Sequence, residues 1–339
     1  MAKNKALYVL PGGLKVGAAQ LGMHGETVGS IKTNVHDGDT VNVRLIRNLG
    51  VRFLGIDTPE VSLEFPGSGE FVSLKKPVWD ELFTSGNWKT GMAMHDGLLA
   101  HLSQRIGDGT GVTQNHADLA DLAQKSLEAI MEADLQKSQK TKETFELFMA
   151  FGHEFLDGYG RLLCYLNSAR ENFEDEALAR AATRWSYNER QLMSGWSAPY
   201  FIWPNVQPFI NQKPFDEKNA TPSGFWNTIK GANKLQAARD AVAQARTQGI
   251  GIFDPSNPLK IMPFELRMIS RKKGPDRYVI NLADEDATYL LEPSLYYLIP
   301  NPEDRLYVPA EYVAVFRLYG WNVLGADAVA FLNEGKIKR

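Results

Sequence analysis

Apolar and polar residues alternate over much of residues 26–56, in the runs TVGSIKTNV, TVNVRLI and VRFLGI. A period of two is typical of β-strands that bury one face. The sequences HDG at 36–38 and RNLG at 47–50 separate the last two runs from what precedes them, and their glycine and asparagine residues favour turns. This segment therefore predicts an antiparallel meander.

Later segments add strands and helices to this meander. The runs TFELFMAFG and RLLCYLN are strand-like and flank the turn sequence HEFLDGYG. Apolar residues at helical spacing over 116–139 predict one amphipathic helix with Asn115 as its N-cap, and further helical runs cover 174–186, 188–195 and 234–249. Five strands with helices behind them indicate an α+β fold, a small barrel backed by helices.

The chain changes character twice more. Residues 61–114 are rich in Gly, Ser, Thr and Trp and are much longer than an ordinary connection, which indicates an insertion. After Gly249 the prolines of the sequence IFDPSNPLKIMP interrupt regular structure. The strand-like runs FELRMIS, RYVINLAD, ATYLLEP and YVPAEYVAVFRLYGW follow. We therefore predict an N-terminal extension at 1–25, a main domain at 26–254 with an insertion at 61–114, and a small β-rich C-terminal module at 255–339.

Composition narrows the class of protein. Of 339 residues, 37 are Lys or Arg and 40 are Asp or Glu, so no overall positive field attracts nucleic acid and any such site must be built locally. The single cysteine, Cys164, excludes an internal disulfide and a multi-cysteine zinc site. The start of the chain lacks a sustained apolar run and no later run is long enough to span a membrane, so we expect a cytoplasmic protein without membrane partners.

Acidic residues gather at the ends of the predicted strands. Asp37, Asp39 and Asp57 lie where barrel loops would bring side chains together, and clustered carboxylates repel one another unless protons or a cation compensate. Oxygen ligands favour a hard cation such as Ca²⁺ or Mg²⁺, with Asp39 and Asp57 as candidate ligands. The alternative interpretation also stands at this point: DGD is a hairpin turn, and DTPE is a capping box that opens a helix.

Three motifs carry a resemblance to a known family. DGDTVNVRL at 37–45, the run from Arg52 to the DTPE that ends at Glu60, and DGYGR at 157–161 resemble the staphylococcal nuclease (thermonuclease) family. The resemblance spans roughly residues 26–254 and implies a five-stranded OB-type β-barrel with three packed helices. The chain departs from that pattern in its long insertion, its C-terminal extension and Gly158, where small members carry lysine.

The resemblance implies a metal site and a base. Asp39 and Asp57 match the calcium-binding aspartates, and the backbone carbonyl of Thr58 is a further ligand. Asp37 matches a neighbouring aspartate that supports these ligands. Glu60 matches the glutamate that acts as general base or orients the attacking water.

The resemblance also implies a set of substrate contacts. Arg52 and Arg161 match two arginines that grip the scissile phosphate, and a guanidinium can bind two phosphate oxygens at once, as a lysine cannot. Tyr159 and Tyr200 match tyrosines in the family and are the predicted substrate-binding residues.

These residues together predict a metal-dependent nuclease. It would hydrolyse phosphodiester bonds of DNA, with RNA as a further substrate, leave 3′-phosphate ends and show little sequence specificity. Ca²⁺ is the expected cofactor, with Mg²⁺ and Mn²⁺ as alternatives because all three accept oxygen ligands. The competing hypothesis is a catalytically inactive OB-fold scaffold that binds nucleic acid or protein. We also expect self-association or a regulatory partner through the C-terminal module.

Overall fold

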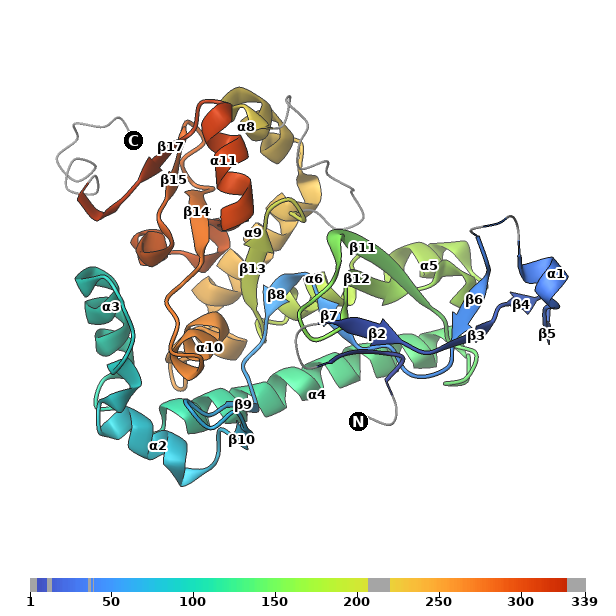
Figure 1. Ribbon diagram of the computed structural model, residues 1–339, viewed down its shortest axis with the longest axis horizontal. Coiled ribbons are helices and arrows are strands. Elements are labelled where there is room, and N and C mark those ends of the chain that lie inside the picture. Colours follow the sequence, from blue (N-terminus) through green and yellow to red (C-terminus); the bar gives the residue numbers. More distant parts are fainter. Residues whose placement is uncertain (1–4, 11–13, 36–37, 39, 207–219, 328–339) are drawn as a thin grey trace. The chain divides into compact units, whose positions relative to one another are not determined.

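The computed structural model describes residues 5–10, 14–35, 38, 40–206 and 220–327. The chain is a mixture of helices and strands, so the α+β prediction is confirmed (Figure 1). Its contacts divide it into unit 1, residues 1–53 and 150–164, and unit 2, residues 54–149 and 165–339. Within the described ranges, none of the helices combines the length and apolar character that a membrane crossing requires.

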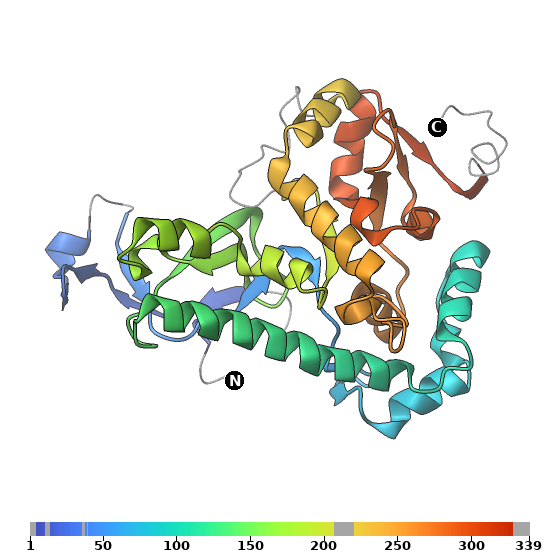
Figure 2. The same ribbon diagram turned by 180° about the vertical axis from the view of Figure 1, so that it is seen from behind.

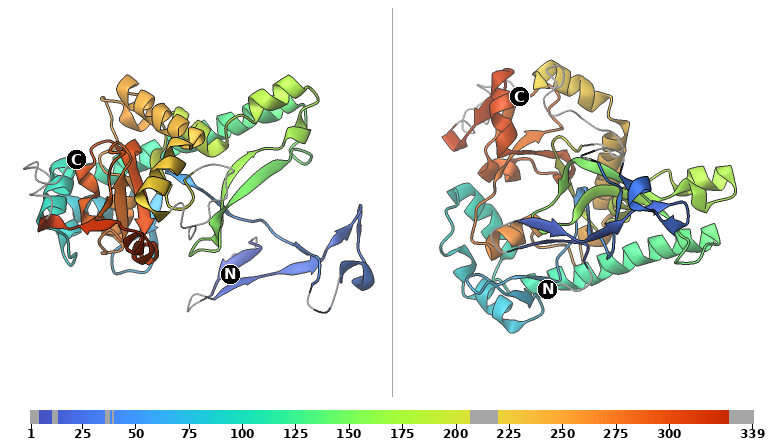
Figure 3. Two further views of the ribbon diagram at one scale, coloured as in Figure 1. Left: turned by 90° about the horizontal axis from the view of Figure 1, so that it is seen from above. Right: turned by 45° about the vertical axis from the view of Figure 1, so that its right-hand side comes forward.

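Unit 1 consists mainly of short strands paired in twos, together with parts of the three-stranded sheet β11-β12-β7. β1 pairs antiparallel with β2, β3 with β6 and β4 with β5, and Figure 3 shows this part of the chain in blue. β7 instead pairs parallel with the start of β12. The elements are β1 (Leu7–Val9), β2 (Lys15–Gly17), β3 (Ala19–Leu21), β4 (Met23–His24), β5 (Thr27–Val28), α1 (Ile31–Asn34), β6 (Val43–Leu45), β7 (Val51–Phe53), and residues 150–156 of β11 (Leu147–Leu156) and 162–164 of β12 (Leu162–Ser168).

The predicted antiparallel meander over residues 26–56 is wrong. α1 interrupts it because the Ser30 hydroxyl accepts a hydrogen bond from the backbone N–H of Thr33 and caps a helical turn. The strands of the segment pair with partners outside it: β5, before α1, pairs with β4, and β6 and β7, after α1, pair with β3 and β12. Among the described residues, every sheet is an open row of strands and none closes into a barrel.

Unit 2 contains a six-stranded sheet in the order β17-β15-β14-β16-β13-β8. β8 pairs antiparallel with β13, β13 parallel with β16, and β16 antiparallel with β14. Strands from residues 26–254 and from residues 255–339 therefore share one sheet. The domain boundaries predicted from the sequence stay predictions. The strands are β8 (Gly55–Asp57), β13 (Ala198–Ile202), β14 (Arg277–Asn281), β15 (Tyr289–Leu291), β16 (Arg305–Pro309) and β17 (Asn322–Leu324).

Helices make up most of the rest of unit 2. The predicted helical run 174–186 contains α5, and the runs 188–195 and 234–249 match α6 and α9, each of which begins one residue earlier than predicted. The two predicted strands beside DGYGR are β11 and β12. A two-stranded ribbon, β9 (Ser62–Glu64) with β10 (Phe71–Ser73), precedes α2. The helices are α2 (Pro77–Thr84), α3 (Asp96–Ile106), α4 (Val112–Ser138), α5 (Glu176–Ala182), α6 (Tyr187–Met193), α8 (Pro222–Lys230), α9 (Asn233–Gln248), α10 (Pro263–Ser270) and α11 (Ala310–Leu318), with 3₁₀ turns η1 (Asn87–Lys89), η2 (Arg170–Asn172), η3 (Gly251–Phe253), η4 (Pro293–Leu298) and η5 (Pro302–Asp304).

The long helix α4, conspicuous in Figure 2, confirms the predicted amphipathic helix but not its N-cap. The helix begins at Val112 after Gly111, so Asn115 lies inside its first turn. The Asn115 amide instead donates to the side chain of Asn257 at 2.8 Å and to the carbonyl of Pro258 at 3.1 Å. The Asn115 side chain therefore binds a distant loop instead of capping the start of the helix.

The prediction that the tail is built of strands is wrong at two places. FELRMIS forms α10, because Pro263 suits the first turn of a helix and Glu265 accepts the backbone N–H of Met262 at 2.6 Å. The run YVPAEYVAVFRLYGW divides into β16 and α11. β14 and β15 lie in the predicted strand-like runs.

One large core joins the insertion to the tail. Trp79, Phe83 and Leu98 from the insertion are buried in the same apolar cluster as Leu266 and Tyr307 from the C-terminal segment. Burial of each such side chain contributes about 1.5–3 kcal/mol. The insertion is thus part of the main core of unit 2, and it fixes the position of α10.

Candidate functional site

Asp57 is the last residue of β8, the edge strand of the unit 2 sheet. β8 pairs with β13 so that Ala198 lies opposite Asp57 and Tyr200 opposite Gly55. Gly55 has a φ of +76°, and a Cβ there would lie 3.3 Å from the hydroxyl of Tyr165. Glycine therefore allows the backbone conformation at the start of β8, the strand that ends at Asp57.

Arg267 of α10 holds both predicted carboxylates of unit 2. Its two terminal nitrogens donate to the two oxygens of Asp57 at 2.9 and 2.8 Å, and one of them also donates to Glu60 at 2.6 Å. Only 1% of the Asp57 side chain and 17% of the Arg267 side chain are exposed. Burial alone would lower the pKa of Arg267, but the charges of Asp57 and Glu60 outweigh it and raise that pKa.

His116 of α4 supports Glu60 from the other side. Its Nδ1 accepts the backbone N–H of Glu60 at 2.8 Å, and its ring is fully buried. Burial lowers the pKa of His116 to about 4, although the charge of Asp57 acts in the opposite direction. The ring is therefore neutral at pH 7. The sequence motifs assigned no role to His116, because it lies 56 positions from Glu60.

Tyr200, a predicted substrate contact, is bound by a second arginine of the tail. Arg277 of β14 donates to the Tyr200 hydroxyl at 2.5 Å, and its guanidinium lies 5.2 Å from the centre of the ring. Phe264 stacks on the same ring with 5.6 Å between ring centres. Burial raises the pKa of Tyr200, so its hydroxyl is protonated at neutral pH.

Unit 1 contains both predicted phosphate-binding arginines. In the parallel pair of β7 and β12, Arg52 lies opposite Leu163. Arg161 directly precedes β12 and lies next to Gly50. Gly50, two residues before Arg52, makes room, since a Cβ there would lie 3.1 Å from Cγ of Arg161.

The DGYGR turn holds Arg161 in place. One oxygen of Asp157 accepts the backbone N–H groups of Tyr159 and Arg161 at 2.8 and 2.9 Å, and the other accepts Nε of Arg161 at 2.6 Å. The guanidinium lies 5.4 Å from the ring centre of Tyr159. Since Nε alone is used by Asp157, the terminal nitrogens form the end of the side chain that can reach a phosphate. Asp157 thus fixes both the DGYGR turn and the Arg161 side chain.

The predicted metal site is only partly within the described residues. Asp37 and Asp39 lie outside them, whereas Thr58 directly follows Asp57 and is partly exposed. Both oxygens of Asp57 and one of Glu60 accept from Arg267. In this arrangement the carboxylates are compensated by a guanidinium, so the described donors do not fit a divalent cation unless Arg267 moves.

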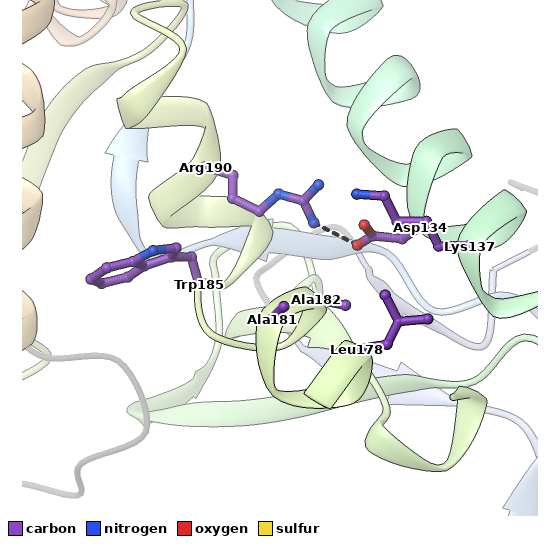
Figure 4. A pocket seen from close by; sticks show the side chains of 7 residues that line it. All are labelled: Asp134, Lys137, Leu178, Ala181, Ala182, Trp185 and Arg190. Carbon is purple, nitrogen blue, oxygen red and sulfur yellow. Dashed lines mark hydrogen bonds and ion pairs between the residues drawn. The ribbon is translucent and has the colours of Figure 1, made fainter. Parts of the chain in front are cut away.

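A separate cavity of about 180 Å³ lies beside the C-terminal half of α4, between α5 and α6 (Figure 4). Arg190 donates to Asp134 across it at 2.5 Å, and Ser168 donates to the same oxygen at 3.0 Å. The other lining residues are Lys137, Leu178, Ala181, Ala182 and Trp185. None of the predicted site residues lines this cavity.

No family model matches the chain, and searches of curated proteins and of solved structures also give no match. The case for a function therefore rests on the residues of this chain and on the motifs that they form.

Proposed function

We propose that the protein is a metal-dependent nuclease of the staphylococcal nuclease type that hydrolyses phosphodiester bonds of DNA and RNA. The products would carry 3′-phosphates, and cleavage would show little sequence specificity. The observation that supports this proposal most directly is the placement of the two arginines of unit 1, Arg52 in β7 and Arg161 directly before β12, the parallel partner of β7. Two guanidinium groups suit the oxygens of a phosphodiester.

The proposal gives each remaining residue a role. Glu60 would orient and deprotonate the attacking water. Asp39, Asp57 and the carbonyl of Thr58, supported by Asp37, would hold Ca²⁺, with Mg²⁺ or Mn²⁺ as alternatives. When bound, the cation would neutralise charge on the phosphate and polarise it toward attack.

Two kinds of contact would bind the substrate, ion pairs from arginines and ring contacts from tyrosines. Arg52 and Arg161 would bind the phosphate, while Tyr159 and Tyr200 would contact the neighbouring sugar or base. We further propose the five-stranded OB-type barrel with three helices, a cytoplasmic location, and self-association or a regulatory partner through the C-terminal module.

The test is cleavage of single-stranded DNA, double-stranded DNA and RNA with Ca²⁺, Mg²⁺, Mn²⁺ or chelator. We expect cation-dependent cleavage by the wild type and a loss of about 10²–10⁴ in rate for Glu60→Gln. Arg161→Lys should lose about 10² or more, because lysine cannot bind two oxygens. Arg44→Lys, an exposed arginine of β6, is the matched control and should cleave normally. A folded wild type that cleaves none of these substrates with any cation contradicts the proposal.

One observation favours the second candidate, a non-catalytic nucleic-acid-binding scaffold. Arg267 already compensates Asp57 and Glu60, as it would in a chain that no longer binds a cation. The scaffold hypothesis predicts that labelled single-stranded DNA binds with equal affinity in Ca²⁺ and in chelator and remains intact. Fluorescence anisotropy, followed by electrophoresis of the same samples, separates the two candidates.

A further inference from the structure

We propose that Arg267 competes with the divalent cation for Asp57, so that the C-terminal segment controls the metal site through one guanidinium. This inference rests on the proposed function, because it assumes that Asp57 is a metal ligand. It goes beyond that function because it makes α10, which lies outside the region of the family resemblance, a regulator of the site.

The contacts of Arg267 place it where the cation would act. The guanidinium binds both oxygens of Asp57, at 2.9 and 2.8 Å, and Glu60 at 2.6 Å. Oxygen ligands of Ca²⁺ lie about 2.3–2.6 Å from the ion. A cation that reached an Asp57 oxygen at that distance would lie next to a positive guanidinium. The two positive charges repel each other, and they do so strongly because the site is buried.

Charge balance points in the same direction. Asp57 and Glu60 carry two negative charges and Arg267 one positive charge, so this set is singly negative. Addition of a divalent cation without loss of Arg267 would leave it singly positive in a place where Asp57 is 1% exposed. If Arg267 leaves, the two carboxylates and the cation balance. Since uncompensated buried charge is costly, one cation replaces the other.

α10 is firmly anchored apart from this contact. Glu265, two residues before Arg267, is fully buried and accepts the Tyr296 hydroxyl at 2.7 Å and an Arg105 nitrogen at 3.2 Å. The helix therefore stays in place while the long side chain of Arg267 changes its partner. A cation must then displace Arg267 from Asp57 in order to bind. The apparent affinity for the cation is therefore the intrinsic affinity multiplied by the fraction of chains in which Asp57 is not paired with Arg267.

The experiment is calorimetric titration of the full chain with Ca²⁺, without substrate. Arg267→Gln should bind Ca²⁺ about tenfold or more tightly than the wild type, because the competing charge is gone. Arg246→Gln is the control, since it breaks another ion pair of unit 2, with the buried Glu303 at 2.7 Å, and should leave the Ca²⁺ affinity unchanged. A folded Arg267→Gln that binds Ca²⁺ no more tightly than the wild type overturns the inference.

Arg267→Lys covers the case in which the glutamine variant fails to fold. Lysine keeps a positive charge but donates as a single point, so its competition should weaken and the Ca²⁺ affinity should rise about threefold. An unchanged or lower affinity contradicts the inference. In the Asp57→Asn background, replacement of Arg267 should no longer change Ca²⁺ affinity, because the shared partner has lost its charge.

The failure of this inference and the failure of the proposed function give different results. If the wild type binds Ca²⁺ and cleaves nucleic acid but both Arg267 variants bind Ca²⁺ no more tightly, only the competition is wrong. If neither the wild type nor the Arg267 variants bind Ca²⁺, Mg²⁺ or Mn²⁺, the metal site of the proposed function is wrong, and the competition with it.

Discussion

Unit 1 and unit 2 differ sharply in how they bury apolar side chains. The buried apolar residues in the described part of unit 1 are Ala6, Leu162 and Cys164. In the same unit Ile31 is 69% exposed and Val43 56%. In unit 2, by contrast, many large side chains are at most 2% exposed, among them Trp79, Phe83, Tyr187, Trp203, Phe225 and Phe316. The first unit has little core, and the second has a large one.

The two groups of proposed site residues, the arginines and the carboxylates, therefore lie in units with different cores. The arginines that we propose to bind phosphate lie in and directly beside a small strand pair, whereas Asp57 and Glu60 are connected to the large core through Arg267 and His116. Substitutions in unit 1 should therefore change substrate binding with little loss of stability. Substitutions at the carboxylates of unit 2 should change both.

The largest expected effect on stability is at Asp57. Asp57→Ala leaves Arg267 buried without its main partner and should cost about 3–5 kcal/mol of the free energy of unfolding. Arg161→Ala in unit 1 removes a half-exposed ion pair with Asp157 and should cost less than about 1 kcal/mol. Urea denaturation followed by circular dichroism measures both. Equal losses for the two variants would contradict the contrast between the units.

The Asp57–Arg267 pair also shows what the sequence could and could not predict. The two residues are 210 positions apart, and no local pattern connects positions so distant. FELRMIS alternates between apolar and polar residues as a strand does, which led to the wrong prediction. Pro263 and Glu265 favour the start of a helix, and this local signal outweighs the alternation in the fold. In contrast, β12, α6 and α9 were predicted correctly because their apolar spacing matches the faces that they bury. DGYGR and DTPE marked Arg161, Asp57 and Glu60 as candidates.

A second expected effect concerns pH. The pKa of His116 falls from an ordinary value of 6.5 to about 4 in the folded chain because of burial. As the pH falls below 6.5, the unfolded chain binds a proton that the folded chain does not, so stability that is present above pH 6.5 is lost toward pH 4. Between pH 7 and pH 5 His116 alone should cost about 2 kcal/mol.

His116→Asn separates this effect from the titration of other groups. The asparagine carbonyl can still accept the backbone N–H of Glu60, but the side chain does not titrate. The difference in unfolding free energy between pH 7 and pH 5 should therefore be about 2 kcal/mol smaller in the variant than in the wild type. Urea denaturation at the two pH values measures it, and an identical difference in both proteins would show that His116 does not bind protons on unfolding.

The smallest expected effect compares one substitution in the two units. Val43 of β6 is 56% exposed, so Val43→Thr should change the free energy of unfolding by less than about 0.5 kcal/mol. Val279 of β14 is fully buried, and Val279→Thr should cost about 1–3 kcal/mol because its hydroxyl enters an apolar core. A loss of that size for Val43→Thr would mean that β6 buries this face, as a closed OB-type barrel requires. The measurement thus tests the open strand pairs of unit 1 against the barrel that the motifs imply.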